Sequence, residues 1–350
     1  MIKLNTLFAT SIVALALVSC KENEAEPTIV VPPSSGSTLT LNGIIANEDG
    51  ASAGNSVYVD LSADKQTPVA RDSWDLGFYC GNDFKVILNA TNGVSVISVN
   101  KTDINAVTST DFDPNNLKVG HGQGNFTIVD DGREKNILNK TAIAPISQND
   151  AENKVYIVNR KGGSANVLPN EDLYKIKILR KGTTGYSLQY AKVNDKSFKI
   201  LDISKNNEFN FQFVSLAKEA ITNVEPQKTE WDIIWGYSIY FTATIPYGFS
   251  DLVFINNIGG VTAAEILTET KLYKDFSKAD ASSLTFSANR DIIGSNWRAT
   301  TGNPAGVKSD RFYVIKDSKG NIYKLKFNSF GVGNDTGTRG KPVIQYELLK

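Results

Sequence analysis

The sequence contains few of the side chains that most often build metal sites and catalytic triads. Its 350 residues include one histidine, one methionine and two cysteines. Met1 and Cys20 lie near the N-terminus, so His121 and Cys80 are the only residues of these types in the rest of the chain. A zinc site of cysteine and histidine therefore lacks ligands, and we expect no disulfide within the chain. We find no catalytic constellation and expect that the protein is not an enzyme.

The chain also lacks an excess of charge of either sign. Lysine plus arginine and aspartate plus glutamate number 37 each. Without a net electrostatic field, neither nucleic acid nor an anionic membrane surface is an expected partner. Hydrophobic residues make up 41% of the chain, which is enough for a sizeable core in one large or two modest domains.

Only one long apolar run is present, and it lies near the N-terminus at residues 7–18. About a dozen residues suit the hydrophobic region of a signal peptide, whereas a membrane-spanning helix needs roughly 20. The run ends in Leu17-Val18-Ser19-Cys20, which resembles the bacterial lipobox, in which the cysteine is acylated. The sequence therefore predicts a lipoprotein signal peptide over residues 1–19 and lipid attachment at Cys20.

A polar segment follows this cysteine. Residues 21–37 contain three glutamates, three prolines and three serines but no aromatic residue. This composition is typical of a flexible tether, which we place with the lipidated cysteine at residues 20–40. The acidic patch resembles the surface-export signal of Bacteroidetes lipoproteins. We expect an outer-membrane lipoprotein that is exposed on the cell surface and held to the membrane by its acyl chains.

The rest of the sequence is typical of β-structure. Apolar and basic residues alternate at 174–178 and 323–327, as they do in a half-buried strand. Glycine and asparagine mark turns between such runs. The best short helical candidates are residues 217–224 and 262–270. We therefore expect an all-β protein of sandwich-like antiparallel sheets with few short helices.

A pattern of motifs occurs twice in the same order. An extended segment at 57–62 precedes Trp74-Asp75, and a similar one at 211–216 precedes Trp231-Asp232. Later, residues 172–176 are echoed by residues 310–315. Each half has about 150 residues, a normal domain size. The repeat predicts two tandem copies of one β module, at residues 41–205 and 206–350.

These motifs resemble those of the HmuY family of haem-binding bacterial surface lipoproteins. In that family a Trp-Asp-hydrophobic box is followed much later by a Tyr-Val-rich hairpin that turns at Asp-Gly. Residues 74–78 carry the box here, and residues 310–327 carry the hairpin. The resemblance covers most of the chain, and it implies two tandem HmuY-like β modules.

The resemblance also implies haem capture for iron acquisition, with delivery to a TonB-dependent outer-membrane receptor. Characterised members hold the iron with a pair of histidines or a pair of methionines. Neither pair can be built from one histidine and one methionine. The alternative is a HmuY-like scaffold without iron ligation, which binds another ligand or a partner protein at the cell surface.

The candidate ligands for haem iron are His121, Tyr79 and Cys80, because imidazole, phenolate and thiolate all ligate haem in proteins. His121 is flanked by glycines, which is also typical of a solvated loop without a ligand. Tyr79 and Cys80 directly follow the first Trp-Asp box, where core packing is the more common role.

The two boxes themselves, Trp74-Asp75 and Trp231-Asp232, could place a carboxylate with a shifted pKa beside an apolar ring. Their repetition favours a structural role instead. We expect each tryptophan to fill a core and each aspartate to accept backbone hydrogen bonds at the end of a strand.

The lipobox generates the first prediction. Cys20→Ala should leave the protein without lipid and remove it from the outer-membrane fraction, because Cys20 is the only cysteine at the end of the apolar run. Metabolic labelling with a fatty acid, followed by membrane fractionation, measures both effects. Label that persists on the variant would contradict the assignment, and Cys80→Ala is the matched control that should label normally.

Overall fold

The computed structural model describes residues 31–333 and 335–350, and the predicted signal peptide and Cys20 lie outside them. Contacts divide the chain at Pro32, and residues 33–350 form one compact unit. This unit is built from 20 strands, short 3-10 turns and one four-residue helix, which confirms the all-β prediction. The first described strand begins at Gly36, inside the segment predicted as a tether.

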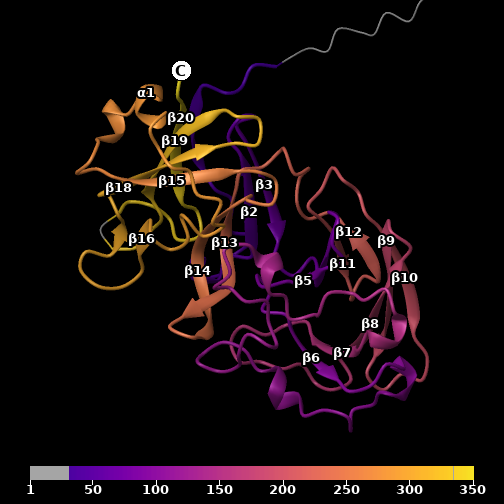
Figure 1. The fold of residues 1–350 in the computed structure, drawn as a ribbon. Helices are drawn as coiled ribbons and strands as arrows, with labels where there is room; N and C mark the ends of the chain where they lie inside the picture. Colours follow the sequence, from indigo (N-terminus) through magenta and orange to yellow (C-terminus); the bar gives the residue numbers. More distant parts are fainter. Residues whose placement is uncertain (1–30, 334) are drawn as a thin grey trace, which may run out of the picture. The chain divides into compact units, whose positions relative to one another are not determined.

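Eighteen of the strands form four antiparallel sheets, which we name A to D (Figure 1). Sheet A contains, in order, β1 (Gly36–Thr40), β20 (Val343–Leu348), β19 (Ile322–Ser329), β18 (Arg311–Lys316) and β15 (Thr262–Leu267). Sheet B contains β14 (Ile245–Ile255), β13 (Ile233–Thr242), β2 (Asn55–Asp60) and β3 (Lys65–Ala70). Sheet C contains β12 (Ala220–Thr222), β11 (Phe211–Ser215), β4 (Leu76–Tyr79) and β5 (Val86–Leu88). Sheet D contains β10 (Lys199–Ser204), β9 (Gly185–Lys192), β8 (Tyr174–Lys181), β7 (Val155–Asn159) and β6 (Ser95–Val99).

The remaining elements are short. Strands β16 (Arg298–Ala299) and β17 (Gly306–Val307) form a separate pair. The 3-10 turns and the helix are η1 (Gly50–Ser52), η2 (Ile104–Ala106), η3 (Pro114–Leu117), η4 (Ile137–Asn139), η5 (Asp150–Glu152), η6 (Tyr273–Asp275) and α1 (Lys278–Ala281).

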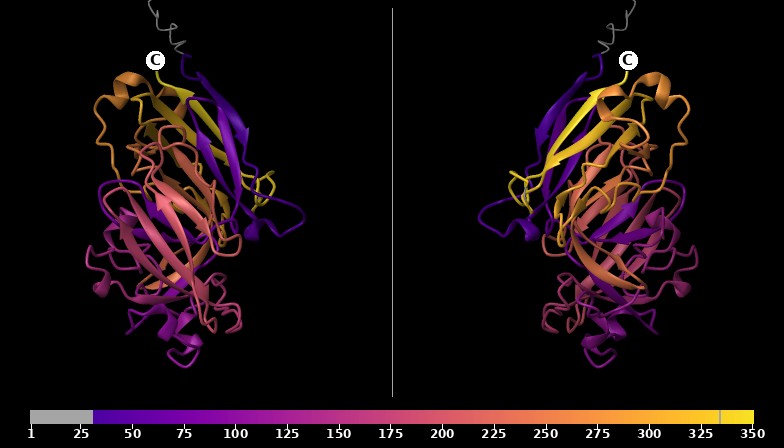
Figure 2. Two further views of the ribbon diagram at one scale, coloured as in Figure 1. Left: turned by 90° about the vertical axis from the view of Figure 1, so that its right-hand side faces the viewer. Right: turned by 90° about the vertical axis from the view of Figure 1, so that its left-hand side faces the viewer.

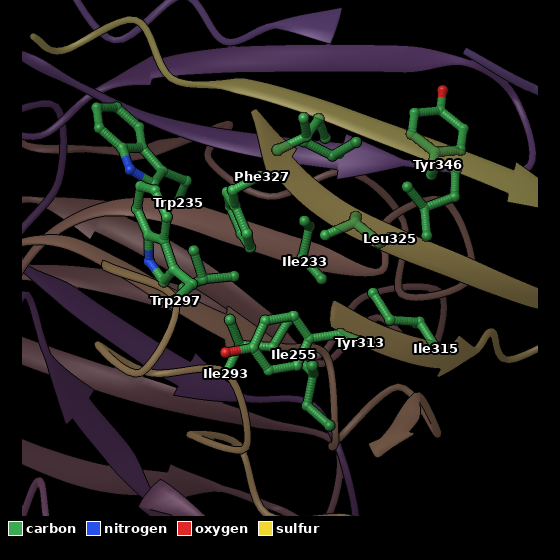
Figure 3. Close-up of a cluster of buried hydrophobic side chains, with 14 of the residues drawn as sticks. Ile233, Trp235, Ile255, Ile293, Trp297, Tyr313, Ile315, Leu325, Phe327 and Tyr346 are labelled. Atoms are coloured by element: carbon green, nitrogen blue, oxygen red, sulfur yellow. The ribbon is translucent and has the colours of Figure 1, made fainter. Parts of the chain in front are cut away.

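The four sheets are layered in the order A, B, C, D, and a hydrophobic core lies between each adjacent pair (Figures 1 and 2). The core between A and B includes Trp235 of β13 and Trp297, whose ring stacks on Phe327 at 4.1 Å between centroids (Figure 3). The core between C and D includes Phe78 of β4 and Tyr186 of β9. A third cluster, with both Trp-Asp tryptophans, lies between B and C. Strand alternation explains this layering, because odd and even residues of the inner strands face different cores.

Two hairpins of the inner sheets pair across the predicted module boundary near residue 205. The β2–β3 hairpin comes from the first half of the chain, yet β2 pairs with β13 of the second half. The β11–β12 hairpin follows residue 205, yet β11 pairs with β4 of the first half. Each half therefore supplies a hairpin to the sheet that contains the Trp-Asp box of the other half.

The aspartates of the two boxes hold these exchanged hairpins in the same way. Asp75 Oδ2 accepts a hydrogen bond from the backbone N–H of Leu216 at 2.7 Å. Asp232 Oδ2 accepts one from the N–H of Leu61 at 2.8 Å. Both carboxylates are buried, and each satisfies an N–H at the end of a strand that would otherwise lack a partner.

A buried asparagine donates a hydrogen bond to the backbone of each Trp-Asp box. Asn89 Nδ2 donates to the backbone oxygen of Trp74 at 2.8 Å, and Asn256 Nδ2 donates to that of Trp231 at 3.0 Å. Both asparagines are buried and lead into a positive-φ glycine, Gly93 or Gly260. The repeat analysis missed this element, although Asn-x-x-x-Gly-Val occurs in both halves.

Sheets A and D have the same pattern of strand pairing, and this pattern corrects the predicted correspondence between strands of the two halves. Tyr174 lies on β8, between β7 and β9, whereas Phe312 lies on β18, between β15 and β19. The counterpart of β8 is β19, and the segments Tyr174-Lys175-Ile176 and Tyr323-Lys324-Leu325 correspond. The predicted correspondence between residues 172–176 and residues 310–315 is therefore wrong, because an alternating hydrophobic pattern does not identify which strand of one sheet corresponds to which strand of the other.

The two helical candidates are also wrong. Residues 262–267 form β15, and residues 220–222 form the short strand β12. In β15, β-branched and small apolar residues pack between two layers, so its apolar positions have no clear alternation. The tertiary environment outweighs the local helical propensity of Thr-Ala-Ala-Glu-Ile-Leu.

The exchanged hairpins generate the second prediction. A fragment of residues 41–205 lacks β11 and β13, so β2 and β4 would lose their central partners, and it should show no cooperative unfolding transition. A fragment of residues 71–226 contains every strand of sheets C and D and should unfold cooperatively. Urea unfolding followed by tryptophan fluorescence compares the two. Cooperative unfolding of 41–205 alone would restore the boundary near residue 205.

Candidate functional site

His121 lies at the tip of an exposed turn between Gly120 and Gln123. Its own φ is +49°, a left-handed conformation that non-glycine residues seldom adopt. The base of the turn packs against the loop at Gly163 and Ala165. The side chain is exposed, and it lines neither of the two hollows described below.

Tyr79 and Cys80 lie at the end of β4, in a different part of the fold. The ring of Tyr79 packs on Phe211 at 5.7 Å, and burial raises the pKa of its phenol. Cys80 is buried, its thiol lies 3.7 Å from the backbone oxygen of Phe78, and burial raises its pKa. A thiol held neutral in this way is a poor ligand, since metals bind the thiolate.

These positions do not form the two-ligand haem site that the resemblance implies. No recorded contact joins His121 to Tyr79 or Cys80, and the chain has no second histidine. The pair of axial histidines or methionines that the resemblance implies therefore cannot be built from the described residues.

A surface hollow at the ends of strands β18 and β19 in sheet A has dimensions that suit a larger ligand. Its volume is about 630 Å³, within the usual range of roughly 300–1,000 Å³ for small-molecule sites. We call it the sheet A groove. Its aromatic and aliphatic lining comes from η6, β17, β18 and β19, and consists of Leu272, Tyr273, Val307, Phe312 and Phe327.

The rim of the sheet A groove is basic. Lys274, Lys308 and Lys326 lie on it, and in the described chain none of the three lies within ion-pair distance of a carboxylate. Arg311 also contributes but is already paired with Asp310 and Glu265. Asp335 is the only acidic lining residue, and its carboxylate is occupied by backbone N–H groups of its own loop.

The sequence analysis did not identify this groove. Its lysines are separated by up to 52 residues, and in a chain with 37 basic residues nothing distinguishes them. Only the pairing of β18 with β19, and the packing of Tyr273 against Phe312, brings them together. Lys324, which the alternation places on a polar face, is instead buried and donates to the backbone oxygen of Tyr273 at 3.0 Å.

The interior contains carboxyl groups that have no basic partner. Burial raises the pKa of Glu225 to about 8, and it raises those of Asp130 and Asp232 to about 7. Asp75 differs from Asp232 because Arg160 lies 2.9 Å from its carboxylate. Burial still raises the pKa of Asp75, since loss of solvent outweighs the attraction of the arginine.

Between residues 31 and 350, leaving out Asn334, no group of three or more histidine, cysteine, aspartate or glutamate side chains could hold a metal ion. In the same part of the chain, no helix has the length and apolarity to cross a membrane.

Comparison with known protein families matches residues 52–346 to the family described as HmuY protein. The chain belongs to the HmuY family. The match runs as a single range through residue 205, and so it includes both Trp-Asp boxes and every strand from β2 to β19. Neither the curated proteins nor the solved structures gave a match to this HmuY protein.

The buried carboxyl groups generate the third prediction. These groups keep their protons up to a higher pH in the folded state than in the unfolded state, where their pKa is about 4. Between pH 5 and pH 8 they are therefore more protonated in the folded state. The unfolded state then binds fewer protons, so the free energy of unfolding should fall as pH rises. Asp232→Asn keeps an acceptor for Leu61 and should reduce this fall by more than about 1 kcal/mol.

Urea unfolding at each pH measures this effect. The exposed Asp150→Asn serves as the matched control and should leave the slope unchanged. A slope that is identical in wild type and Asp232→Asn would show that Asp232 is ionised in the folded protein.

Proposed function

We propose that this HmuY protein is a cell-surface lipoprotein that captures haem or a related porphyrin for iron acquisition. Membership of the HmuY family over residues 52–346 is the observation that carries the proposal. The family is associated with haem binding, and the predicted lipid at Cys20 would keep the protein at the outer membrane. A TonB-dependent receptor is the proposed recipient of the porphyrin, and we propose binding rather than catalysis.

The sheet A groove is the proposed position of the porphyrin. A porphyrin presents a large apolar face, which suits the lining of Leu272, Tyr273 and Val307. Its carboxylates are complementary in charge to Lys274, Lys308 and Lys326 on the rim, and unpaired lysines can form such ion pairs without first losing a partner.

The proposal makes iron ligation optional. Tyr273 is the only tyrosine that lines the groove, and burial raises the pKa of its phenol, which opposes the phenolate form. Contacts of the porphyrin ring and its carboxylates would then supply most of the affinity. His121 stays a candidate ligand only if its loop binds haem at a separate position.

We also propose that the two halves derive from one duplicated module whose hairpins have been exchanged. The shared pairing pattern of sheets A and D and the matched hydrogen bonds of Asp75 and Asp232 support this origin. Divergence would then explain why a groove with a basic rim lies on sheet A.

The fourth prediction tests the groove. Ferric haem titrated into the protein without residues 1–20 should give a saturable change in the Soret band with one site per chain. Replacing Lys274, Lys308 and Lys326 together by glutamine should weaken binding about tenfold, since three exposed charge pairs are lost. Iron-free protoporphyrin should bind wild type with similar affinity, as followed by its fluorescence.

The matched control replaces the exposed Lys161, Lys196 and Lys218, which lie outside the groove, by glutamine. This variant and His121→Ala should bind haem as wild type does. Loss of the spectral change in His121→Ala, together with no binding of iron-free protoporphyrin, would show that His121 holds the iron and that the groove is not the site.

The second candidate function is a HmuY-like scaffold that binds a different ligand or a partner protein. The absence of any second histidine in the sequence favours it. No saturable binding of either haem or protoporphyrin would select this function over the first.

A further inference from the structure

A second hollow lies inside the fold, between the facing sides of sheets B and C. Its volume is about 150 Å³, and its residues come from strands of both inner sheets and from both Trp-Asp boxes. Several aromatic side chains contribute to its wall, among them Tyr58, Trp74, Phe211, Phe213, Trp231 and Phe254. It shares no lining residue with the sheet A groove and is too small to enclose a porphyrin.

At two corresponding positions, sheet B carries smaller side chains than sheet C does. When the two Trp-Asp boxes and the strands bound to their aspartates are aligned, Phe211 of sheet C corresponds to Ser56 of sheet B, and Tyr79 corresponds to Gly236. The rings of Phe211 and Tyr79 pack against each other on sheet C. On sheet B the same two positions carry a hydroxymethyl group and a hydrogen, and both residues line the cavity.

Two polar atoms in the cavity wall have no hydrogen-bond partner in the described chain. They are the indole nitrogen Nε1 of Trp231 and the hydroxyl oxygen of Ser56. Trp231 is 8% exposed and Ser56 is 5% exposed, so solvent does not satisfy them. A buried donor without an acceptor is costly, and native proteins seldom leave one unpaired.

Glu225 adds a third polar group to the wall. Its Oε1 accepts a hydrogen bond from the backbone N–H of Phe211 at 2.8 Å, and burial keeps its carboxyl neutral below about pH 8. Asp130 and Arg290 also line the cavity, and their opposite charges attract each other. The cavity is otherwise largely apolar, and it offers one indole donor and one hydroxyl group that have no partner in the described chain.

We propose that this cavity is a second ligand site, which takes a neutral single-ring aromatic molecule that carries one oxygen atom. A cavity of about this volume accommodates a benzene ring. The oxygen would accept from Trp231 Nε1, and a hydroxyl on the ligand could donate to Ser56. Water alone could satisfy these two atoms but would leave the aromatic wall without contacts. The site is independent of porphyrin binding.

The experiment uses phenol as the probe and toluene as its isostere without the oxygen. In two-dimensional NMR spectra of the nitrogen-labelled protein without residues 1–20, the four tryptophans give four indole N–H signals. Phenol should move the signal of Trp231 in a saturable way at about millimolar concentration or below. The signals of Trp235 and Trp297, which belong to the core between sheets A and B, should stay in place.

Trp231→Phe removes the donor and should weaken phenol binding about tenfold while it leaves toluene binding nearly unchanged. Trp235→Phe is the matched control, because its indole nitrogen is also buried without a partner but lies outside the cavity. It should bind phenol as wild type does. If Trp231→Phe does not fold, Ser56→Ala and the comparison of phenol with toluene in wild type test the same hydrogen bonds.

Equal affinity of wild type for phenol and toluene would remove the role of the polar atoms and overturn the proposal. So would a Trp231 signal that does not move at saturating phenol, which would show a cavity filled only by water. Loss of haem binding in the groove variants would have no bearing on these outcomes, because no residue is shared between the two sites.

Discussion

The fold depends on the burial of two aspartate side chains at the ends of exchanged hairpins. Asp75 and Asp232 each bind a backbone N–H of a strand that arrives from the other half of the chain. Buried carboxylates tolerate this position because the hydrogen bond, and for Asp75 the nearby Arg160, offset part of the loss of solvent. The two inner sheets consequently cannot form from either half of the chain alone.

Both proposed sites arise where this repeated frame is interrupted. The inner cavity lies beside Ser56 and Gly236, at positions where sheet C carries a pair of rings, and the sheet A groove lies where η6 and β17 meet the ends of β18 and β19. Each inner sheet packs its other face against a hydrophobic core. Variation in a few side chains and loops can therefore change the ligand without changing the fold.

The sequence predicted the fold class and the family, because strand alternation and the Trp-Asp boxes are local features. It did not predict that β2 pairs with β13, since pairing between strands 170 residues apart has no local signature. The site was predicted less well. His121, Tyr79 and Cys80 were selected by chemical type, whereas the groove depends on Lys274, Lys308 and Lys326, which are distant in sequence and typical of any surface.

The pairing of β1 with β20 has a mechanical consequence. β1 is an edge strand of sheet A, joined to β20 through five residue pairs from Gly36–Glu347 to Thr40–Val343. Just before it, Ser34 binds Ser62 and Tyr323 through its backbone. Tension that arrives along the chain from the N-terminal side would load this edge ladder first. The load would pass to sheet A through β20 and to the β2–β3 turn through Ser62, and sheet B would lie between sheet A and the cavity.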